Sequence, residues 1–587
     1  MSKLSRREFV YMMAVLGAAP VFANSHTRMT NSGKLEDYYK LQNFGNARFL
    51  HMTDSHAQLM PVYFREPSVN LGFHGNYGKP PHIVGEKLLD YYGIKGDKRL
   101  EYAYSCVNFE KHAKAMGRVG GFAQIKTVVD YLRNNFGKEK TLLLDGGDTW
   151  QGSATALYTR GKDMVGAMNK LGVDVAVGHW EFTYKAEEIL ANVKELDAEF
   201  LAQNVFVKED ALMDGADAFD EDSGLAFKPY TIKKMGNARV AVIGQAFPYT
   251  TIANPQRFIP DWTFGIKEEE MQELVDTIKE EEKPDAIIVL SHNGYDVDKK
   301  MAEVVTGIDF FMGGHTHDGV PEAYPVKNDG GTTYVCNAGS NGKFLNVLDL
   351  DIQNGKIKDF KFTLLPIFSD LIPEDKEMKK YIEDVRAPYI KDLMRPIATT
   401  DETLFRRGNF NGSWDQIICD ALVDVKDAEI SLSPGFRWGT SVMPGQAITF
   451  DDLMTQTAMT YPETYMREIS GQGIKDILED VADNLFNEDP FYQQGGDMVR
   501  TGGISYKINP TAQMGKRISD IQLTRNGAKL EASKNYKVAG WSTVGSKSPG
   551  KPVWETVETY LQSVKHVKNL KIDSPDIIGV KGNPGIV

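Results

Sequence analysis

Residues 47–56 read Ala-Arg-Phe-Leu-His-Met-Thr-Asp-Ser-His, a short apolar run that ends in an Asp-x-His pair. The run predicts a strand over 47–52, with the polar pair in the loop that follows it. Five later stretches have the same strand-like character: 141–145, 173–177, 239–243, 286–290 and 310–312. Helical patterns such as 120–135 and 267–281 lie between several of them. This order predicts an α/β layered domain with a buried sheet.

Metal-ligand residues follow the predicted strands repeatedly. Besides Asp54-Ser55-His56, the fragments are Gly147-Asp148, Gly178-His179-Trp180-Glu181, Ser291-His292-Asn293 and Gly314-His315-Thr316-His317. A lone histidine after a strand is more often structural than a ligand, but five such fragments in this order are hard to explain by packing. The candidate ligands are Asp54, His56, Asp148, His179, His292, His315 and His317.

The mixture of imidazole and carboxylate indicates two divalent cations. Two cations close together repel each other, so an anionic ligand must lie between them, and Asp148 is the candidate bridge. Imidazole and carboxylate together suit manganese, iron, cobalt or zinc. A dinuclear pair lowers the pKa of bridging water and stabilises charge on a transferred group. The predicted chemistry is therefore hydrolysis of an oxyanion ester or its analogue.

Composition narrows the class of protein. The 587 residues are too many for one core and predict two or three domains. The formal net charge of −13 disfavours nucleic acid and anionic membranes as partners. The three cysteines, Cys106, Cys336 and Cys419, are widely spaced and odd in number, so they predict buried thiols rather than disulfides or a thiolate-rich zinc site.

Residues 1–25 are predicted to be a twin-arginine signal peptide. Arg6 and Arg7 precede the apolar stretch 10–22, and Ala23 follows it. An accidental basic start before a buried helix is the alternative. No later run reaches the roughly 18 apolar residues of a transmembrane helix. We therefore expect export to the periplasm by the twin-arginine route, with no membrane anchor.

The rest of the chain divides into three predicted parts. These are a dinuclear metallohydrolase domain over 46–366, a linker helix over 367–395 and a C-terminal substrate-binding domain over 396–587. The stretch 57–117 is rich in Gly, Pro and Tyr, and is too long for an ordinary loop. We predict that it covers the site.

The order of these motifs resembles that of the calcineurin-like metallophosphoesterases, and within them the 5′-nucleotidase branch. The resemblance covers residues 46–545 and is highly specific in the metal motifs. It implies a four-layer α/β/β/α sandwich followed by a second, smaller α/β domain of 5′-nucleotidase C-terminal type, with substrate bound between them. It also implies that Asp54, His56, Asp148 and His317 hold one metal, and that Asp148, His179, His292 and His315 hold the other.

The run Gly178-His179-Trp180-Glu181-Phe182-Thr183 departs from the nucleotidase pattern Gly-Asn-His-Glu-Phe-Asp. Trp180 takes the position of a catalytic histidine, and Thr183 takes that of the aspartate that orients it. An indole can neither donate a proton as a general acid nor accept one at neutral pH. A sulfur leaving group needs that proton far less than an alkoxide does, because a thiol has a pKa of about 8.5.

This version of the motif, with the twin-arginine signal, looks like the thiosulfohydrolases of the Sox sulfur-oxidation system. That resemblance implies hydrolysis of the terminal sulfone from a cysteine S-thiosulfonate, with release of sulfate. It also implies two Mn²⁺ ions as cofactor and, as partner, a SoxYZ-type sulfur carrier protein with a cysteine-bearing arm.

Trp180, Asn293 and Arg437 are the candidate catalytic residues. Arg437 lies in Ser433-Pro434-Gly435-Phe436-Arg437-Trp438, where nucleotidases have a substrate loop. Its guanidinium could clamp sulfonate oxygens, although a structural arginine is an equal alternative. Gly495-Gly496-Asp497 is interpreted as a turn. The phenylalanine that nucleotidases use to stack a base is not found near 498–505.

Two other functions stay open at this stage. A periplasmic 5′-nucleotidase or cyclic phosphodiesterase could take its general acid from elsewhere in the chain. A non-catalytic metal-binding protein is the third reading, and the complete ligand set argues against it.

Overall fold

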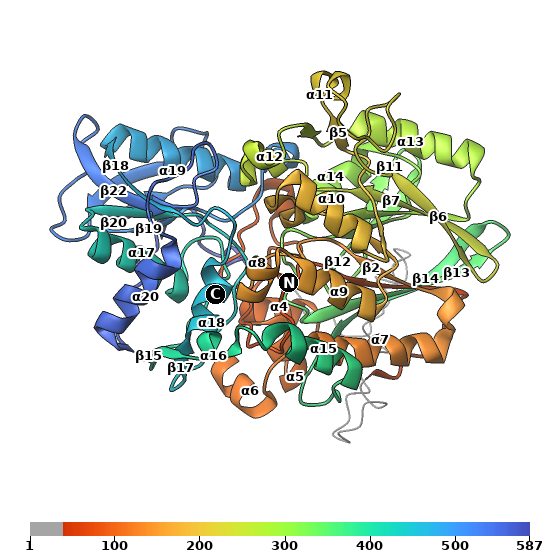
Figure 1. Ribbon diagram of the computed structural model, residues 1–587, viewed down its shortest axis with the longest axis horizontal. Helices are drawn as coiled ribbons and strands as arrows, with labels where there is room; N and C mark the ends of the chain where they lie inside the picture. The colour runs from red at the N-terminus through yellow and green to blue at the C-terminus, as the bar shows by residue number, and fades with distance from the viewer. Residues whose placement is uncertain (1–38) are drawn as a thin grey trace, which may run out of the picture.

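The computed structural model describes residues 39–587, so the predicted signal peptide lies outside the described residues. Two six-stranded sheets form the first part of the chain (Figure 1), in the orders β14-β13-β1-β2-β3-β4 and β11-β12-β10-β9-β7-β6. The first sheet contains β1 (Ala47–Met52), β2 (Thr141–Asp145), β3 (Val175–Ala176), β4 (Glu199–Phe200), β13 (Phe344–Gln353) and β14 (Lys356–Pro366). The second contains β6 (Tyr230–Met235), β7 (Ala238–Gln245), β9 (Ala286–Ser291), β10 (Phe310–Gly313), β11 (Tyr324–Asn328) and β12 (Gly331–Asn337).

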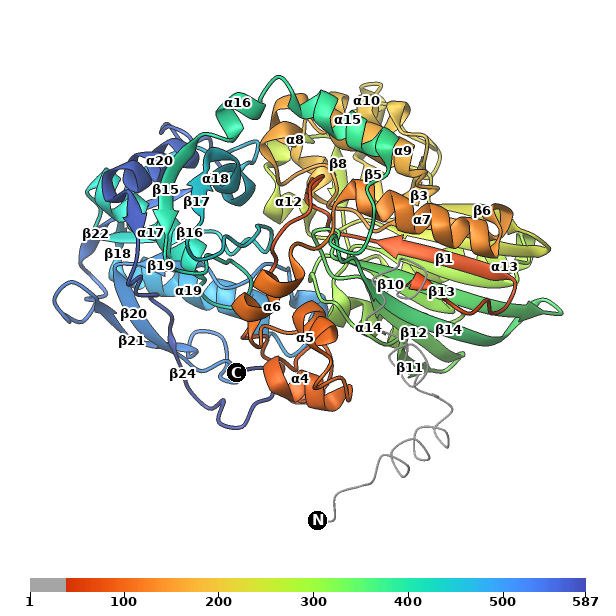
Figure 2. The same cartoon turned by 90° about the horizontal axis from the view of Figure 1, so that it is seen from below.

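The two sheets pack face to face, with helices outside each. Along β1, Phe49 faces the core between the sheets and Leu50 faces the outer helices, as the alternation of a strand requires. Helices α7 (Phe122–Phe136), α9 (Lys162–Leu171) and α15 (Lys376–Arg386) cover the first sheet (Figure 2), and α13 (Glu268–Glu281) and α14 (Tyr295–Val304) cover the second. The predicted four-layer α/β/β/α sandwich is confirmed.

A second α/β unit follows, built on a four-stranded sheet in the order β18-β22-β16-β19. Its strands are β16 (Ile430–Ser433), β18 (Thr464–Ser470), β19 (Arg500–Gly502) and β22 (Asn535–Trp541). Helices α17 (Ser413–Lys426), α18 (Phe450–Thr457) and α20 (Val553–Val564) share one core with this sheet, and α19 (Gly471–Phe486) belongs to another. Two small three-stranded sheets complete the unit: β17 (Ala447–Thr449), β15 (Pro396–Thr400) and β23 (His566–Val567), and β21 (Ile518–Leu523), β20 (Ile504–Ile508) and β24 (Asp576–Ile577).

The segment between the two units contains two helices, α15 and the short α16 (Ile390–Leu393), where the sequence predicted one. The α15 helix packs on the first unit, where the hydroxyl of Tyr381 donates a hydrogen bond to the carbonyl of Asp163 at 2.7 Å. Within residues 39–587, no helix combines the length and apolar character that a bilayer crossing requires.

The long stretch 57–117 forms three α-helices on the first unit: α4 (Gly85–Tyr91), α5 (Lys98–Tyr104) and α6 (Phe109–Met116). The last residues of the chain return to it, beside α4 in Figure 2. The amide of Val84 donates to the carbonyl of Pro584, and that of Asn70 donates to Gly585. The ammonium of Lys87 bonds the carbonyls of Asn583 and Ile586. The second unit is thus attached to the first at both of its ends.

Candidate metal centre

Five strand ends deliver the seven predicted ligands to one place. β1, β2 and β3 are parallel neighbours in one sheet, and β9 and β10 are parallel neighbours in the other, so within each sheet the loops after the strands lie side by side. Face-to-face packing of the sheets then brings the two sets of loops together. Asp54 and His56 follow β1, Asp148 follows β2, His179 follows β3, His292 follows β9, and His315 and His317 follow β10. All seven side chains are buried. The structure therefore brings together every residue predicted from the sequence as a metal ligand.

The backbone at these loops is unusual. Asp54, His56, Asp148, His315 and His317 all have positive φ angles, between 45° and 72°. Residues other than glycine seldom adopt this region, and each costs free energy that the surrounding fold must offset. Such strain is concentrated at functional sites, because ligand geometry dictates the backbone there.

The ligand atoms form two groups that share one carboxylate. Asp54, His56, Asp148 and His317 make one group, and Asp148, His179, His292 and His315 make the other. Within each group the ligand atoms lie within 4.8 Å of one another. Asp148 Oδ2 lies 3.1 Å from His292 Nε2 and 3.6 Å from His56 Nε2. Asp148 is therefore placed to bridge, as predicted.

Hydrogen bonds to backbone carbonyls fix which ring nitrogen of a ligand histidine faces the cluster. His56 Nδ1 lies 3.2 Å from the carbonyl of Gln151, and His292 Nδ1 lies against that of Gly146. In both rings Nδ1 carries the proton that it donates to the carbonyl, which leaves Nε2 as an acceptor toward the cluster. The Nε2 atoms of His56 and His317 lie 3.0 Å apart. A proton or a cation must separate these two lone pairs.

The electrostatics of the cluster fit metal binding. Burial lowers the pKa of His56 to about 4, and the pKa values of His315 and His317 lie well below the usual histidine range for the same reason. Burial raises the pKa of Asp148, but the imidazoles of His179 and His292 outweigh it, so the pKa lies well below its ordinary value. Four of the five imidazoles are therefore neutral around an ionised carboxylate, whereas the neighbouring carboxylates Asp148 and Asp54 outweigh burial at His292 and raise its pKa to about 10.

The donor set fits a pair of divalent cations. Several ring nitrogens of the cluster are buried without a hydrogen-bond partner, among them Nε2 of His179, Nδ1 of His317 and both ring nitrogens of His315. Unpaired buried polar atoms are costly, so a cluster of them is typical of a metal-binding site. Nitrogen and carboxylate oxygen, with no cysteine, match borderline metals such as manganese, iron or zinc.

Glu181 supports this cluster from behind, a role that the sequence analysis did not assign. Its carboxylate is 1% exposed and accepts four backbone N–H bonds, from Asp148 (3.1 Å), Thr149 (2.6 Å), Trp150 (3.2 Å) and His179 (2.8 Å). One side chain thus ties the loop after β2 to the loop after β3. Its place two residues after His179 was the only local signal for it.

Trp180 lies beside the metal ligands in an aromatic wall. Its ring packs edge-on against Trp438 at 5.0 Å and against Phe436 at 5.5 Å, and it lies 5.1 Å from the ring of His179. The side chain is 5% exposed. Its backbone N–H donates to Asp148 Oδ1 at 2.8 Å. An apolar surface therefore lies beside the cluster at this position.

Thr183 makes a contact between the two units of the chain. Its hydroxyl lies 2.7 Å from the hydroxyl of Thr460, which also lies 2.9 Å from the carbonyl of Thr183. The side chain is buried. The position therefore holds the second unit against the first and offers no carboxylate to orient a base.

Arg437 and Asn293 line a cavity of about 530 Å³ between the units, which His315 also lines. Arg437 Nη1 lies 3.4 Å from the carbonyl of His315, and Nη2 donates to the carbonyl of Gly496 at 2.7 Å. The amide group of Asn293 is used internally, donating to Asp298 at 3.0 Å and accepting from Gln245 at 3.1 Å. Arg437 is thus placed for a ligand in the cavity, whereas Asn293 is placed to hold its own loop.

Two further parts of the cavity wall were not recognised from the sequence. Gly495, interpreted there as part of a turn, packs on the metal cluster, since a Cβ added to it would lie 2.0 Å from His315 Nε2. Arg407 is buried and donates to the carbonyl of Thr316 at 2.8 Å and to Asp318 at 3.0 Å. The Gly495-Gly496-Asp497 motif was visible in the sequence but was set aside as a common turn, and the segment around Arg407 carries no motif.

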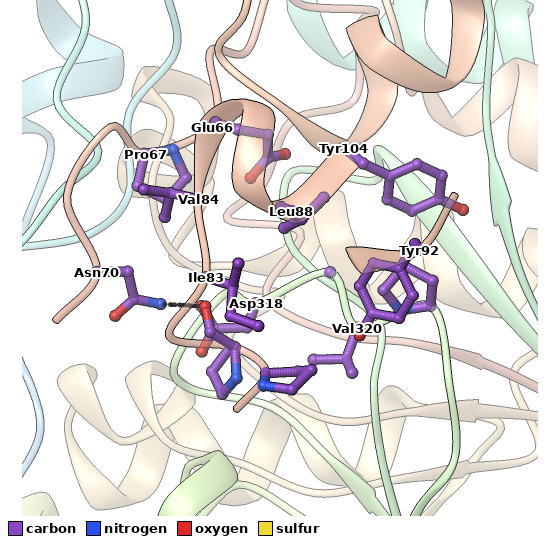
Figure 3. A pocket seen from close by; sticks show the side chains of 15 residues that line it. Glu66, Pro67, Asn70, Ile83, Val84, Leu88, Tyr92, Tyr104, Asp318 and Val320 are labelled. Atoms are coloured by element: carbon purple, nitrogen blue, oxygen red, sulfur yellow. Dashed lines mark hydrogen bonds between the residues drawn. The ribbon is translucent and has the colours of Figure 1, made fainter. Parts of the chain in front are cut away.

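The stretch 57–117 forms another wall of this cavity through residues 70–76. Figure 3 shows its attachment at a smaller neighbouring cavity of about 30 Å³, where the amide of Asn70 points toward Asp318. This hydrogen bond is 3.1 Å long. Asp318 directly follows His317, so the wall is tied to a ligand loop.

Comparison with known proteins shows similarity to 5′-nucleotidases and to a sulfate thiohydrolase of the same fold. A family model described as the 5′-nucleotidase C-terminal domain matches residues 396–555. The solved structure of the Thermus thermophilus sulfate thiohydrolase SoxB, in complex with glycerol, is 33% identical, with a TM-score of 0.84, and the match covers 92% of this chain and 98% of that one. A 5′-nucleotidase precursor, also from Thermus thermophilus, is 20% identical, with a TM-score of 0.70, over 91% and 99% of the two chains, and shares the fold.

Curated relatives include the trifunctional nucleotide phosphoesterase protein YfkN of Bacillus subtilis (strain 168), 28% identical over 455 residues, which are 70% of this chain and 30% of that protein. The 5′-nucleotidase of Bos taurus is 28% identical over 355 residues, which are 56% of this chain and 57% of that protein. The chain thus spans less than two thirds of the length of these relatives.

Proposed function

We propose that this chain, which belongs to the 5′-nucleotidase family of metal-dependent hydrolases, is a thiosulfohydrolase of the SoxB type. Its substrate would be a cysteine S-thiosulfonate on a SoxYZ-type carrier protein with a cysteine-bearing arm. The product would be sulfate, formed during thiosulfate oxidation. The single observation that carries this proposal is that Trp180 and Thr183 stand where nucleotidases have a proton-donating histidine and the aspartate that orients it.

The geometry around these two residues supports a leaving group that departs without a proton. The indole of Trp180 is packed against Phe436 and Trp438, and the hydroxyl of Thr183 is held by Thr460. Neither can deliver a proton to an alkoxide. A sulfur anion is a much weaker base, because a thiol has a pKa of about 8.5. These residues therefore favour a substrate that leaves through sulfur over a nucleotide ester.

The overall reaction can be written so that atoms and charge balance. Water supplies one oxygen to the terminal sulfone, the sulfur–sulfur bond breaks, and sulfate is released. The electron pair of that bond stays on the carrier's sulfur, and two protons pass to solvent. Arg437, which lines the cavity, would donate hydrogen bonds to sulfone oxygens, since guanidinium presents a fork of donors.

Two Mn²⁺ ions are the proposed cofactor. Asp54, His56, Asp148 and His317 would hold one, and Asp148, His179, His292 and His315 the other. When bound, such a pair lowers the pKa of water and offsets negative charge on the transferred group. The protein's own contribution is to hold these side chains in strained loops and to close one side with the aromatic wall.

The proposed location is the periplasm, reached by the twin-arginine route. The Arg6-Arg7 pair before an apolar stretch supports this part of the proposal.

The decisive experiment compares two substrates. Manganese-loaded protein is given a peptide that carries cysteine S-thiosulfonate, and sulfate release is measured by ion chromatography. A parallel reaction with AMP is assayed for phosphate. We expect sulfate and no phosphate, whereas phosphate without sulfate would return the protein to the nucleotidases of its family.

A further inference from the structure

Five charged side chains of the second unit form a continuous buried chain behind the substrate cavity. In order they are Arg437, Asp497, Arg500, Asp415 and Arg406, so positive and negative groups alternate. Their side chains are between 0% and 10% exposed. The five residues come from three separate segments of the sequence: 406–415, the loop at 437, and 497–500. Arg437, at one end of this series, and its neighbour Asp497 line the cavity.

Asp497 is the link nearest Arg437. Its Oδ1 lies 3.4 Å from Arg437 Nε, and its Oδ2 lies 3.1 Å from Arg500 Nη2. Its backbone N–H donates to the carbonyl of Gly435 at 2.8 Å. The carboxylate of Asp497 therefore contacts two arginines at once, and the backbone of Asp497 bonds to the loop that carries Arg437.

The other three residues of the charged series hold Asp497 in place. Arg500 donates to the carbonyl of Gly408 at 3.0 Å, and its Nε lies 3.4 Å from Asp415 Oδ2. Asp415 also accepts from Arg406 at 2.8 Å. Arg406 in turn lies over the stacked rings of Phe436 and Trp438, at 6.0 and 5.9 Å. The loop around Arg437 is thus held from both sides.

We propose that Asp497 is a positioning residue for Arg437, a role that rests on the proposed function of Arg437 as an oxyanion clamp. The carboxylate contacts Nε of the guanidinium, and the carbonyls of Gly496 and His315 accept from Nη2 and Nη1. The group is thus held in one orientation at the cavity wall, and each terminal nitrogen keeps a second N–H. A long side chain that is already ordered loses less conformational entropy when it binds an anion. Asp497 itself does not act on the substrate.

This role can be separated from a general effect of charge, because the two have opposite signs. Asp497→Asn removes a negative charge close to an anion site, so electrostatics alone would tighten anion binding. Loss of positioning would weaken it. The dissociation constant of sulfate, measured by calorimetry with metal-loaded protein at constant ionic strength, therefore distinguishes the two.

We expect Asp497→Asn to weaken sulfate binding at least fivefold, and Arg437→Ala to weaken it by a similar or larger factor. In the Arg437→Ala background, Asp497→Asn should have no further effect, because Asp497 acts through that arginine. Sulfate affinity equal to or tighter than wild type in Asp497→Asn would overturn the proposal. So would fully additive effects in the double variant.

The matched control is Asp349→Asn. Asp349 is a buried carboxylate that holds Arg48 by bonds of 2.6 and 2.7 Å within the first sheet. The substitution should lower stability but leave sulfate affinity unchanged, and a loss of affinity there would show that any broken buried pair has this effect.

If Asp497→Asn does not fold, Asp497→Glu keeps the charge but displaces the guanidinium by the length of one methylene. We expect weaker sulfate binding from it too, and unchanged binding would overturn the proposal. The proposed function is judged separately, by whether the wild-type protein hydrolyses the thiosulfonate peptide. Should it hydrolyse AMP instead, the same coupling is expected with phosphate as the probe.

Discussion

Replacement of Glu181 by glutamine tests whether its carboxylate holds the metal centre together. Oε1 accepts from the backbone N–H groups of Thr149 and Trp150, and Oε2 accepts from those of Asp148 and His179. In Glu181→Gln, the amide nitrogen must face one of these two pairs of donors. Two buried N–H groups then lack an acceptor, in either orientation of the amide.

Each buried donor left unsatisfied costs about 1–3 kcal/mol, so the substitution should lower the free energy of unfolding by about 4 kcal/mol. It also releases the loops that carry two metal ligands. Groups that orient metal ligands typically contribute roughly 10- to 100-fold in metal affinity, and we expect a loss in that range. Chemical unfolding of the metal-free protein measures the first effect, and metal titration measures the second.

Glu479 offers a matched control in the second unit. It is buried and accepts backbone N–H bonds from Gly515 (2.8 Å), Arg517 (3.1 Å) and Ile518 (2.8 Å), with no metal ligand among them. Glu479→Gln should therefore destabilise the fold but leave metal affinity at its wild-type value. Wild-type metal affinity in Glu181→Gln would refute the reasoning, whatever its effect on stability.

Four other perturbations give distinct expectations. Asp148→Asn removes the shared charge, so metal analysis should find fewer than two ions per chain and hydrolysis should be abolished; unaltered activity would contradict a dinuclear mechanism. Trp180→His combined with Thr183→Asp should raise phosphate release from AMP, and no gain would count against the leaving-group argument. In the metal-free protein, burial lowers the pKa of His292, but the neighbouring carboxylates outweigh burial and raise the pKa to about 10. Below that pH, metal binding should therefore release a proton from His292, so metal affinity should rise with pH. Calorimetry in buffers of different ionisation enthalpy measures the released proton. Gly495→Ala places a methyl group against a ligand ring at a φ of +80°, so metal occupancy should fall, and a fully loaded variant would show that the loop can move away.

The order of strands and ligands could be predicted from the sequence because both signals are local. Short apolar runs identify strands, and the residues that follow a parallel strand must lie at one edge of the sheet. The prediction of Asp54, His56, Asp148 and the other candidate ligands needed no knowledge of how the sheets pack. The substitutions at Trp180 and Thr183 were also visible directly, since they lie inside one of these fragments.

Tertiary structure alone decided which contacts support those residues. The bonds from residues 148–150 to Glu181, the approach of Gly495 to His315 and the contact of Arg437 with Asp497 join residues that are far apart in sequence. Such contacts leave no periodic pattern, because they depend on how separate loops meet after the sheets and the second unit have packed. Strand periodicity and ligand type are properties of short segments, whereas hydrogen-bond partners of buried charges are set by the whole fold.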